Sequence, residues 1–379
     1  MPAFSIRDLQ DAEDFVRGCT FYGTGGGGSP EYGLGMLQKV LKQGKEINVI
    51  NSSDVADSAW TCTAYGMGSI APRTPKILAE MKGLGLTKAS VEYKLLEALR
   101  ELERFSKKKV SVIVPVEIGG ANTPDPVATA ALAGLKAVDG DYEGGRAVPE
   151  GLQSMPHLVG RLMVPLVSVD EWGNTVILKN AVNNRAAEKI GKLIAVLAYG
   201  NLAGNATWLF KGSEMKKMLT PGTLSRAFDT GKKIRKMREE GTSLGEFSKS
   251  IGARLVFEGR VTEKVEENRD AEYYWGWYSI GGSGPFRGHA LRVWFKNENH
   301  LTWLDGKPFV TSPDLITAID LGTGEPRINP GIMTGDKLAI FAVPAFEIFR
   351  SKMALEYCGP RHWGFDLPYV PLERVLKAP

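Results

Sequence analysis

The stretch Val112-Ile-Val-Pro-Val-Glu-Ile-Gly-Gly-Ala-Asn-Thr-Pro-Asp-Pro126, "VIVPVEIGGANTPDP", decides the fold. An apolar strand-like run, Val110–Val116, ends at a carboxylate, passes through a glycine pair and reaches a proline-rich helix start. A helical pattern then covers Pro126–Leu135, and a short strand pattern follows at Ala137–Asp139. Strands that alternate with helices in this way predict an α/β layer with a mostly parallel sheet.

The pattern continues outward from this stretch and changes once. Further helices and strands of the first part are predicted at Ile6–Val16, Tyr32–Leu41, Ile47–Asn51, Thr61–Tyr65 and Val91–Phe105. Past about Met163 one helix, Arg185–Tyr199, stands among strands at Leu162–Val169, Thr175–Leu178, Arg254–Val261, Tyr273–Ile280, Ala290–Phe295 and Lys337–Val343. We therefore predict an α/β N-terminal domain over residues 1–165 and a β-rich C-terminal domain over residues 166–379.

Composition and charge exclude several classes of protein. The 379 residues are 43% hydrophobic and 24% charged, which is typical of a globular protein. A formal net charge of +4, without a basic stripe interleaved with aromatic residues, argues against a nucleic-acid partner. Three widely separated cysteines match neither a disulfide framework nor a zinc spacing. We found no signal-like or membrane-length apolar segment, so we expect a cytoplasmic protein without a membrane partner.

A glycine run, "YGTGGGGSPE" at Tyr22–Glu31, leads into the second predicted helix. It contains the letters G-x-G-x-x-G, but a helix precedes it where a dinucleotide fingerprint needs a strand, so we expect no nucleotide cofactor. Backbone N–H groups before a helix start can bind an oxyanion or a substrate carboxylate. The residues proposed for this role are Gly25, Gly26, Gly27 and Gly28. The alternative is a close crossing of two chain segments.

Carboxylates gather after two predicted strands, in "VPVEIGGANTPDP" and in "AVDGDYEGGRAVPE" at Ala137–Glu150. Loops at the carboxyl ends of parallel strands are where α/β sheets bind ligands. Clustered acids repel one another, which raises their pKa values or requires a cation. The catalytic candidates are Glu117, Asp139, Asp141 and Glu150. For each of them, binding backbone N–H groups to hold a loop remains an alternative.

Other polar residues complete the predicted site. Arg146 either pairs with the acids around it or binds a substrate carboxylate through its guanidinium group. Asn122 and Glu298 are expected to contact substrate, and His157 is the histidine nearest in sequence to the acids. Asp139, Asp141 and His157 form the candidate metal site. We expect the two acidic loops to face the glycine run across a cleft that Asn297, Glu298 or His300 closes.

Five segments together resemble the S-methyl thiohydantoin desulfurase domain family, a prokaryotic group associated with hydantoin metabolism. They are "GTGGGGSPEYG", "VPVEIGGANTPDP", "DGDYEGGRAVPE", "FKNENHL" and "GPRHWGFDLPYVPLE", and the likeness runs from about Asp8 to Glu373. The resemblance implies the two domains described above, hydrolytic removal of sulfur from a thiohydantoin ring, and a divalent metal such as zinc, cobalt or manganese. Ser29 departs from the aspartate often found there in the family, which weakens that position as a metal ligand.

These observations lead to two hypotheses about function. In the first, the protein is a hydrolase in which activated water attacks a hydantoin-like or thiohydantoin five-membered ring, cleaving a C–S or a C–N bond. In the second, it is a non-catalytic subunit that binds a small anion or regulates a partner. The ligand is a small cyclic ureide or thioureide in the first case. Eight tryptophans, several in strands of the second domain, predict a homo-oligomer.

Overall fold

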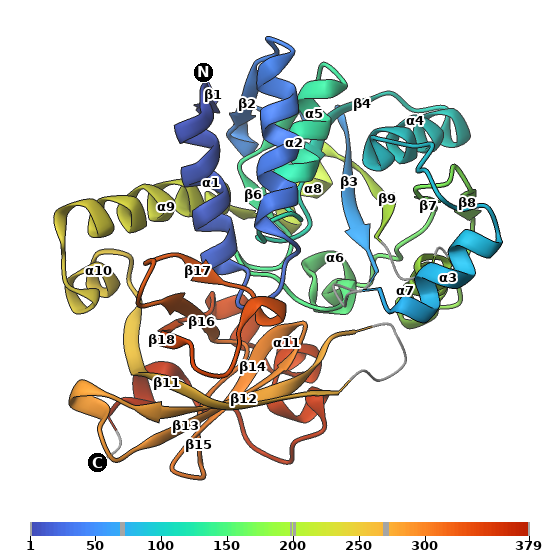
Figure 1. Ribbon diagram of the computed structural model, residues 1–379. Coiled ribbons are helices and arrows are strands. Elements are labelled where there is room, and N and C mark those ends of the chain that lie inside the picture. The colour runs from blue at the N-terminus through green and yellow to red at the C-terminus, as the bar shows by residue number, and fades with distance from the viewer. Residues whose placement is uncertain (1, 69–72, 198, 200–201, 268–272, 378–379) are drawn as a thin grey trace.

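The computed structural model describes residues 2–68, 73–197, 199, 202–267 and 273–377. Two eight-stranded sheets organise the chain, with strand orders β1-β2-β5-β4-β3-β9-β7-β8 and β15-β14-β13-β12-β11-β18-β16-β17. Figure 1 shows the first sheet with its helices in the upper part of the molecule and the second sheet below it. The predicted fold class, an α/β domain followed by a β-rich domain, is confirmed.

The first sheet has a parallel centre. Strands β2, β5, β4 and β3 are neighbours and run parallel, and antiparallel strands extend the sheet at both edges. Its strands are β1 (Pro2–Ile6), β2 (Ile47–Ile50), β3 (Trp60–Met67), β4 (Val110–Val114), β5 (Lys136–Val138), β7 (Leu166–Val169), β8 (Thr175–Leu178) and β9 (Ala203–Lys211). A separate two-stranded pair joins β6 (Gly140–Asp141) to β10 (Thr220–Pro221).

Helices cover both faces of the first sheet. They are α1 (Leu9–Tyr22), α2 (Pro30–Lys42), α3 (Pro75–Gly83), α4 (Lys94–Ser106), α5 (Pro124–Leu132), α6 (Met155–Leu158), α7 (Asn184–Leu197), α8 (Gly212–Met218), α9 (Thr223–Glu240) and α10 (Leu244–Ser250). Side chains of β4 alternate between the two faces. Ile113 joins the core that α1, α2, α4 and α5 share, whereas Val112 and Val114 join the core beside α6, α7 and α8. Burial on both faces explains the continuous apolar run.

The second sheet is antiparallel throughout. It contains β11 (Arg254–Glu267), β12 (Trp275–Gly282), β13 (Ala290–Lys296), β14 (Glu298–Leu304), β15 (Lys307–Thr311), β16 (Leu315–Asp320), β17 (Pro326–Arg327) and β18 (Lys337–Val343), and α11 (Lys352–Cys358) and α12 (Leu372–Val375) follow it. Phe341 of β18 packs against Phe21 of α1 with ring centroids 6.0 Å apart. The two sheets therefore share one hydrophobic core through α1.

The predicted domain boundary at residues 165 and 166 does not follow the sheets. Strands β7, β8 and β9 complete the first sheet, and α9 packs along α1, so the second sheet begins only at Arg254. Two glycines permit the helix crossing, because a Cβ on Gly18 would lie 1.7 Å from the carbonyl oxygen of Ala227 and one on Gly231 equally close to that of Asp14. A strand's apolar pattern does not indicate which sheet the strand joins, so the boundary between the two domains stays a prediction.

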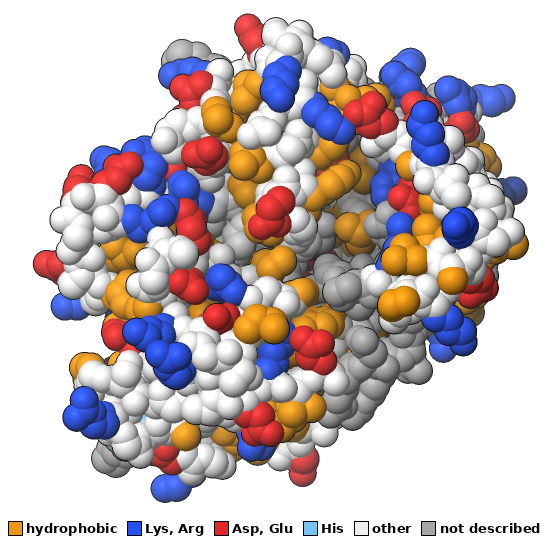
Figure 2. Space-filling model, in the orientation of Figure 1, with side chains coloured by type: hydrophobic (Ala, Val, Ile, Leu, Met, Phe, Trp, Pro, Cys, Tyr) orange, Lys and Arg blue, Asp and Glu red, His pale blue; other side chains and the backbone are white. Residues whose placement is uncertain are grey.

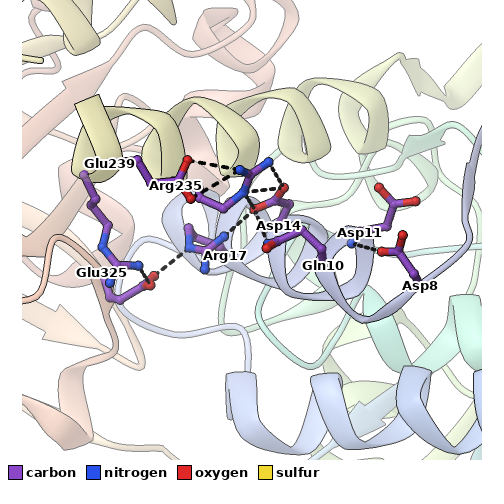
Figure 3. A network of polar contacts seen from close by, with 9 residues as sticks. Asp8, Gln10, Asp11, Asp14, Arg17, Arg235, Glu239 and Glu325 are labelled. Carbon is purple, nitrogen blue, oxygen red and sulfur yellow. Dashed lines mark hydrogen bonds and ion pairs between the residues drawn. The ribbon is translucent and has the colours of Figure 1, made fainter. Parts of the chain in front are cut away.

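A polar network fixes α1 and α9 to the second sheet (Figure 3). Asp14 of α1 is buried and accepts hydrogen bonds from Arg17 and from Arg235 of α9. Arg17 also bonds Glu325, which lies beside β17 and pairs with Arg238 of α9. The network joins three segments that are distant in sequence around one buried carboxylate.

Candidate active site

The glycine run lies against a second glycine-containing loop. A Cβ on Gly27 would be 2.5 Å from the Cα of Gly119, so neither backbone leaves room for a side chain. Ala121 N–H and Asn122 N–H donate to the Gly27 carbonyl oxygen at 2.9 and 3.1 Å. Gly27 N–H donates to Glu298 Oε1 at 3.1 Å. Both predicted alternatives therefore hold in part: two segments cross closely, and the backbone binds a carboxylate, which belongs to the protein itself.

A cavity of about 60 Å³, here called the inner chamber, lies between the glycine run, the carboxyl end of the parallel strands and the start of β14. Carboxyl groups dominate its lining. They belong to Glu117, Glu143, Glu150, Glu188 and Glu298. Lys192 supplies an ammonium group, and Asn122 and Asn297 supply amides. The chamber brings together the glycine run, both acidic loops and residues of the second sheet, as the sequence predicted.

Glu117 and Glu143 form a carboxyl pair. Glu117 follows β4 and accepts hydrogen bonds from Asn122 Nδ2 at 2.5 Å and from Val148 N–H at 2.9 Å. Its charge acts on the carboxyl of Glu143, whose Oε2 is buried and has no hydrogen-bond partner among the described residues. Burial raises the pKa of both groups, and repulsion from Glu117 raises that of Glu143 further. Burial and repulsion therefore both favour a proton on this pair of carboxyls.

Glu298 enters the chamber from the second sheet. It follows Asn297, which takes a left-handed conformation with φ of 58° and exchanges two hydrogen bonds with the backbone of Tyr274. Asparagine tolerates that conformation better than most residues. Burial and repulsion from Glu117 raise the pKa of Glu298. Its Oε2 has no hydrogen-bond partner among the described residues, which leaves one buried acceptor for a ligand.

Glu188 and Lys192 are site residues that the sequence analysis missed. Both are buried on α7, one helical turn apart, with Oε1 and Nζ separated by 3.8 Å. Glu188 Oε2 also accepts from Gly151 N–H at 3.1 Å. Burial raises the pKa of Glu188 to about 6. One sequence pattern could have indicated them: a charged pair at i and i+4 beside the small residues Ala187, Gly191 and Ala195. A helix face of small residues packs closely against its neighbours, so charged residues beside it can be buried.

Glu150 is held at the chamber wall by cations. Lys296 Nζ bonds its Oε1 at 2.5 Å, Tyr273 O–H donates to the same oxygen at 3.1 Å, and His362 Nε2 lies 3.6 Å from Oε2. Burial opposes ionisation, but His362 and Lys296 together hold the pKa of Glu150 well below its usual range. Glu150 is therefore an ionised partner of the second sheet, which suits it less well to proton transfer than the Glu117–Glu143 pair.

Six predicted site residues do not line the inner chamber: Gly25, Gly26, Asp139, Asp141, Arg146 and His157. Asp139 accepts from the backbone N–H and hydroxyl of Ser225, and Asp141 accepts from the N–H groups of Glu143 and Gly145. Burial raises the pKa of Asp141 to about 7. Arg146 donates to the Pro313 carbonyl oxygen and to that of Glu143. These side chains hold loops in place, which was the alternative for each acid.

The predicted metal ligands do not form a site. Both carboxyl oxygens of Asp139 and of Asp141 accept hydrogen bonds from the protein, and His157 Nδ1 contacts the Asn184 amide at 2.9 Å. The His157 ring packs edge-on against Tyr357. Among the described residues, no three His, Cys, Asp or Glu side chains are grouped to hold a metal ion. These three residues therefore do not fit a metal site, and a divalent metal bound elsewhere in the protein stays a prediction.

Comparisons with known proteins agree with the fold. A protein from Chromobacterium violaceum of known crystal structure matches 98% of this chain and 100% of its own, with a TM-score of 0.76 and 20% identity. At that identity the likeness concerns the fold alone. No curated protein matches the sequence. Within the described segments, no helix is both long and apolar enough to cross a membrane.

Two family models match consecutive parts of the chain. The S-Me-THD-like N-terminal domain matches residues 10–180, and the S-Me-THD-like C-terminal domain matches residues 182–372. Together they include every element that lines the inner chamber. The chain belongs to the S-Me-THD-like family.

Proposed function

We propose that the protein is a hydrolase of hydantoin-like or thiohydantoin five-membered rings. The observation that carries the proposal is the convergence of Glu117, Glu143 and Glu298 on one small, buried chamber. Three acids with raised pKa values, two of them each with an unpartnered oxygen, form an arrangement more typical of an active site than of a scaffold. The family to which the chain belongs supports the choice of ring.

The Glu117–Glu143 pair supplies both proton transfers. The ionised member takes a proton from water, whose oxygen bonds to the carbon between the two ring nitrogens. When the C–N bond breaks, the shared proton passes to the departing nitrogen. When the C–S bond breaks, it passes to the departing sulfur, and the added hydroxyl becomes the ring carbonyl as its own proton leaves to solvent or to the ring nitrogen. The proton taken from water replaces the shared proton, so the pair returns to its starting state. Two adjacent carboxyls with one proton between them can act as base and acid in this way.

Glu298 and Lys192 position the ring and balance its charge. The free Oε2 of Glu298 can accept a hydrogen bond from a ring N–H. The Lys192 ammonium faces the negative charge that develops when water adds. The anion-binding alternative has less support, because Gly27 N–H is already bonded to Glu298 and the chamber's acids repel an anion.

The direct test is turnover of the ring by purified protein. Hydantoin, 2-thiohydantoin and S-methyl thiohydantoin are incubated with it, and ring absorbance and released sulfide, methanethiol or ammonia are followed. Each reaction is run after chelation and with added zinc, cobalt or manganese. Turnover of any ring is the expected result. Absence of turnover under every condition contradicts the proposal.

Two buried acids give a matched pair of variants. Glu143→Gln removes the shared proton and should lower kcat by 10²-fold or more, on the order of the usual contribution of proton transfer. Asp139→Asn changes a buried carboxylate that lies outside the chamber and bonds Ser225. It should keep most of the activity of whatever fraction remains folded. Equal loss of activity per folded molecule in both variants contradicts the role of the pair.

A further inference from the structure

A second cavity adjoins the inner chamber on its open side. This outer chamber has a volume of about 770 Å³ and shares Gly28, Gly66, Asn122 and Leu202 with the inner chamber. Figure 2 shows the surface hollowed between α2 and α3, with hydrophobic side chains around the hollow. Asn122 lies at the junction and donates to Glu117. The two cavities are therefore neighbours, separated by these shared residues.

The inner chamber is too small to hold a substituted ring. At roughly 10–15 Å³ for each water, its volume corresponds to about five waters. Five waters, at about 30 Å³ of liquid each, take up about as much room as one unsubstituted five-membered ring. Any substituent on the ring carbon therefore has to lie in the outer chamber.

Apolar side chains form much of the outer wall. They come from α4 and the segment before it, from β9 and from the loop after β17, and they include Val91, Leu95, Ala121, Ala203, Ile328 and Pro330. Such a wall favours a hydrocarbon chain, because each buried methylene group contributes about 0.8 kcal/mol.

Several charged groups of this wall have partners within the protein. Asp125 accepts from the Tyr32 hydroxyl at 3.1 Å, and Arg73 pairs with Glu171. Lys94 Nζ donates to the carbonyl oxygen of Leu202 at 2.5 Å, and no carboxylate pairs with it within the described segments. An ammonium group has three N–H donors, so Lys94 keeps donors for a ligand.

We propose that the outer chamber is the substrate's substituent subsite. It binds an apolar chain on the ring carbon, and the Lys94 ammonium binds an oxygen acceptor, an amide or a carboxylate, at the end of that chain. This assignment names the substrate class of the proposed hydrolase and rests on that function. Asn122 separates the reacting ring edge from the substituent.

The test compares rings that differ only in the substituent: none, butyl, and a chain of the same length ending in an amide or in a carboxylate. The butyl ring should show kcat/KM at least tenfold above the unsubstituted ring, and an oxygen at the end should raise it further. The amide and carboxylate arms distinguish a neutral from an anionic acceptor. Equal kcat/KM for all four rings overturns the proposal.

Substitutions at two positions test where the substituent binds. Lys94→Met should remove the gain from the terminal oxygen and leave the butyl ring unchanged, whereas Lys94→Arg should retain part of that gain. Ala89→Trp, at an exposed position on the chamber rim, should reduce kcat/KM for every substituted ring and spare the unsubstituted one. A loss that is equal for all rings in either variant overturns the subsite.

Calorimetric binding of the same rings separates the two proposals. If no ring is hydrolysed but affinity rises with the substituent and falls in Lys94→Met, the hydrolase proposal fails while the subsite stands. If neither hydrolysis nor affinity depends on the substituent, the subsite fails as well.

Discussion

Gly27 and Glu298 are joined by a 3.1 Å hydrogen bond from backbone N–H to Oε1, although 271 positions separate them in the sequence. The same glycine accepts two N–H groups from the loop after β4 through its carbonyl oxygen. One residue thus ties the second sheet to the carboxyl end of the first. The position of Glu298 in the inner chamber depends on this backbone contact.

Gly27→Ala should unfold the protein more easily. A Cβ there would meet Gly119 Cα at 2.5 Å, and the φ of 72° is unfavourable for alanine. We expect the free energy of unfolding to fall by about 3 kcal/mol, from overpacking and backbone strain together. Urea denaturation measures it.

Gly35→Ala is the matched control. Gly35 lies inside α2, and its added Cβ meets no described atom within 4 Å. Alanine there should raise the free energy of unfolding by about 0.5–1 kcal/mol, because it is the better helix former. Similar stability changes in the two variants would contradict the close-crossing interpretation.

The polar network of Figure 3 gives a second stability prediction. Asp14 has 1% of its side chain exposed and bonds both Arg17 and Arg235. Asp14→Asn leaves two guanidinium groups without their central anion, and we expect a loss of about 2 kcal/mol in unfolding free energy, reduced by the partial exposure of Arg235.

The control for Asp14 is Glu239→Gln. Glu239 bonds the same Arg235 but has 57% of its side chain exposed. Its removal should cost less than about 0.5 kcal/mol. Thermal and urea denaturation of both variants at two salt concentrations provide the comparison, and an equal loss in the two would show that burial does not decide the effect.

Most of the correct predictions rested on patterns of residues that are adjacent in the sequence. Strand β4, the glycine pair after it and the helix start at Pro124 follow one another directly, so the position of Glu117 at a strand end followed from adjacent residues. Helix α2, predicted from Tyr32, begins two residues earlier at Pro30, and Ser29 caps it by accepting from Tyr32 N–H. We predicted the shared chamber because the carboxyl ends of parallel strands lie at the same edge of a sheet.

Long-range packing explains the features that the sequence did not predict. Helix α9 is rich in lysine and arginine and has Gly231 near its centre, so its sequence does not resemble that of a buried helix. One face of α9 is nevertheless buried, because α1 crosses it at Gly231. Asp139 and Asp141, like Glu117, follow a predicted strand, but their hydrogen bonds to distant residues decide their roles, and the sequence does not show those bonds. Lys192 and Glu188 enter the chamber because α7 lies beside it, and their own segment marks them only as a charged i, i+4 pair among small residues.

Assembly in solution remains a prediction. Trp277, Trp294 and Trp303 stand half-buried on the outer face of β12–β14, around a groove of about 540 Å³. Apolar area of this kind commonly marks an interface. Light scattering should give a mass at least twice the 41.3 kDa of one chain, and Trp277→Glu should reduce it. A mass of one chain at all concentrations contradicts the prediction.

Stability should depend on pH through Glu188. Burial raises its pKa to about 6 in the folded protein, against about 4.3 in an unfolded chain. Between these values the folded state binds more protons, so this group's stabilisation is complete below pH of about 4 and is lost as pH rises through about 6.

Glu188→Gln keeps an acceptor for Gly151 N–H but cannot titrate. Relative to this variant, the wild-type protein should therefore lose about 2 kcal/mol of unfolding free energy between pH 4 and pH 7. Urea denaturation of both proteins at pH 4, 5, 6 and 7 measures the difference. A difference that stays constant over this range would show that Glu188 titrates alike in the folded and unfolded states, and that the inner chamber does not disfavour its charge.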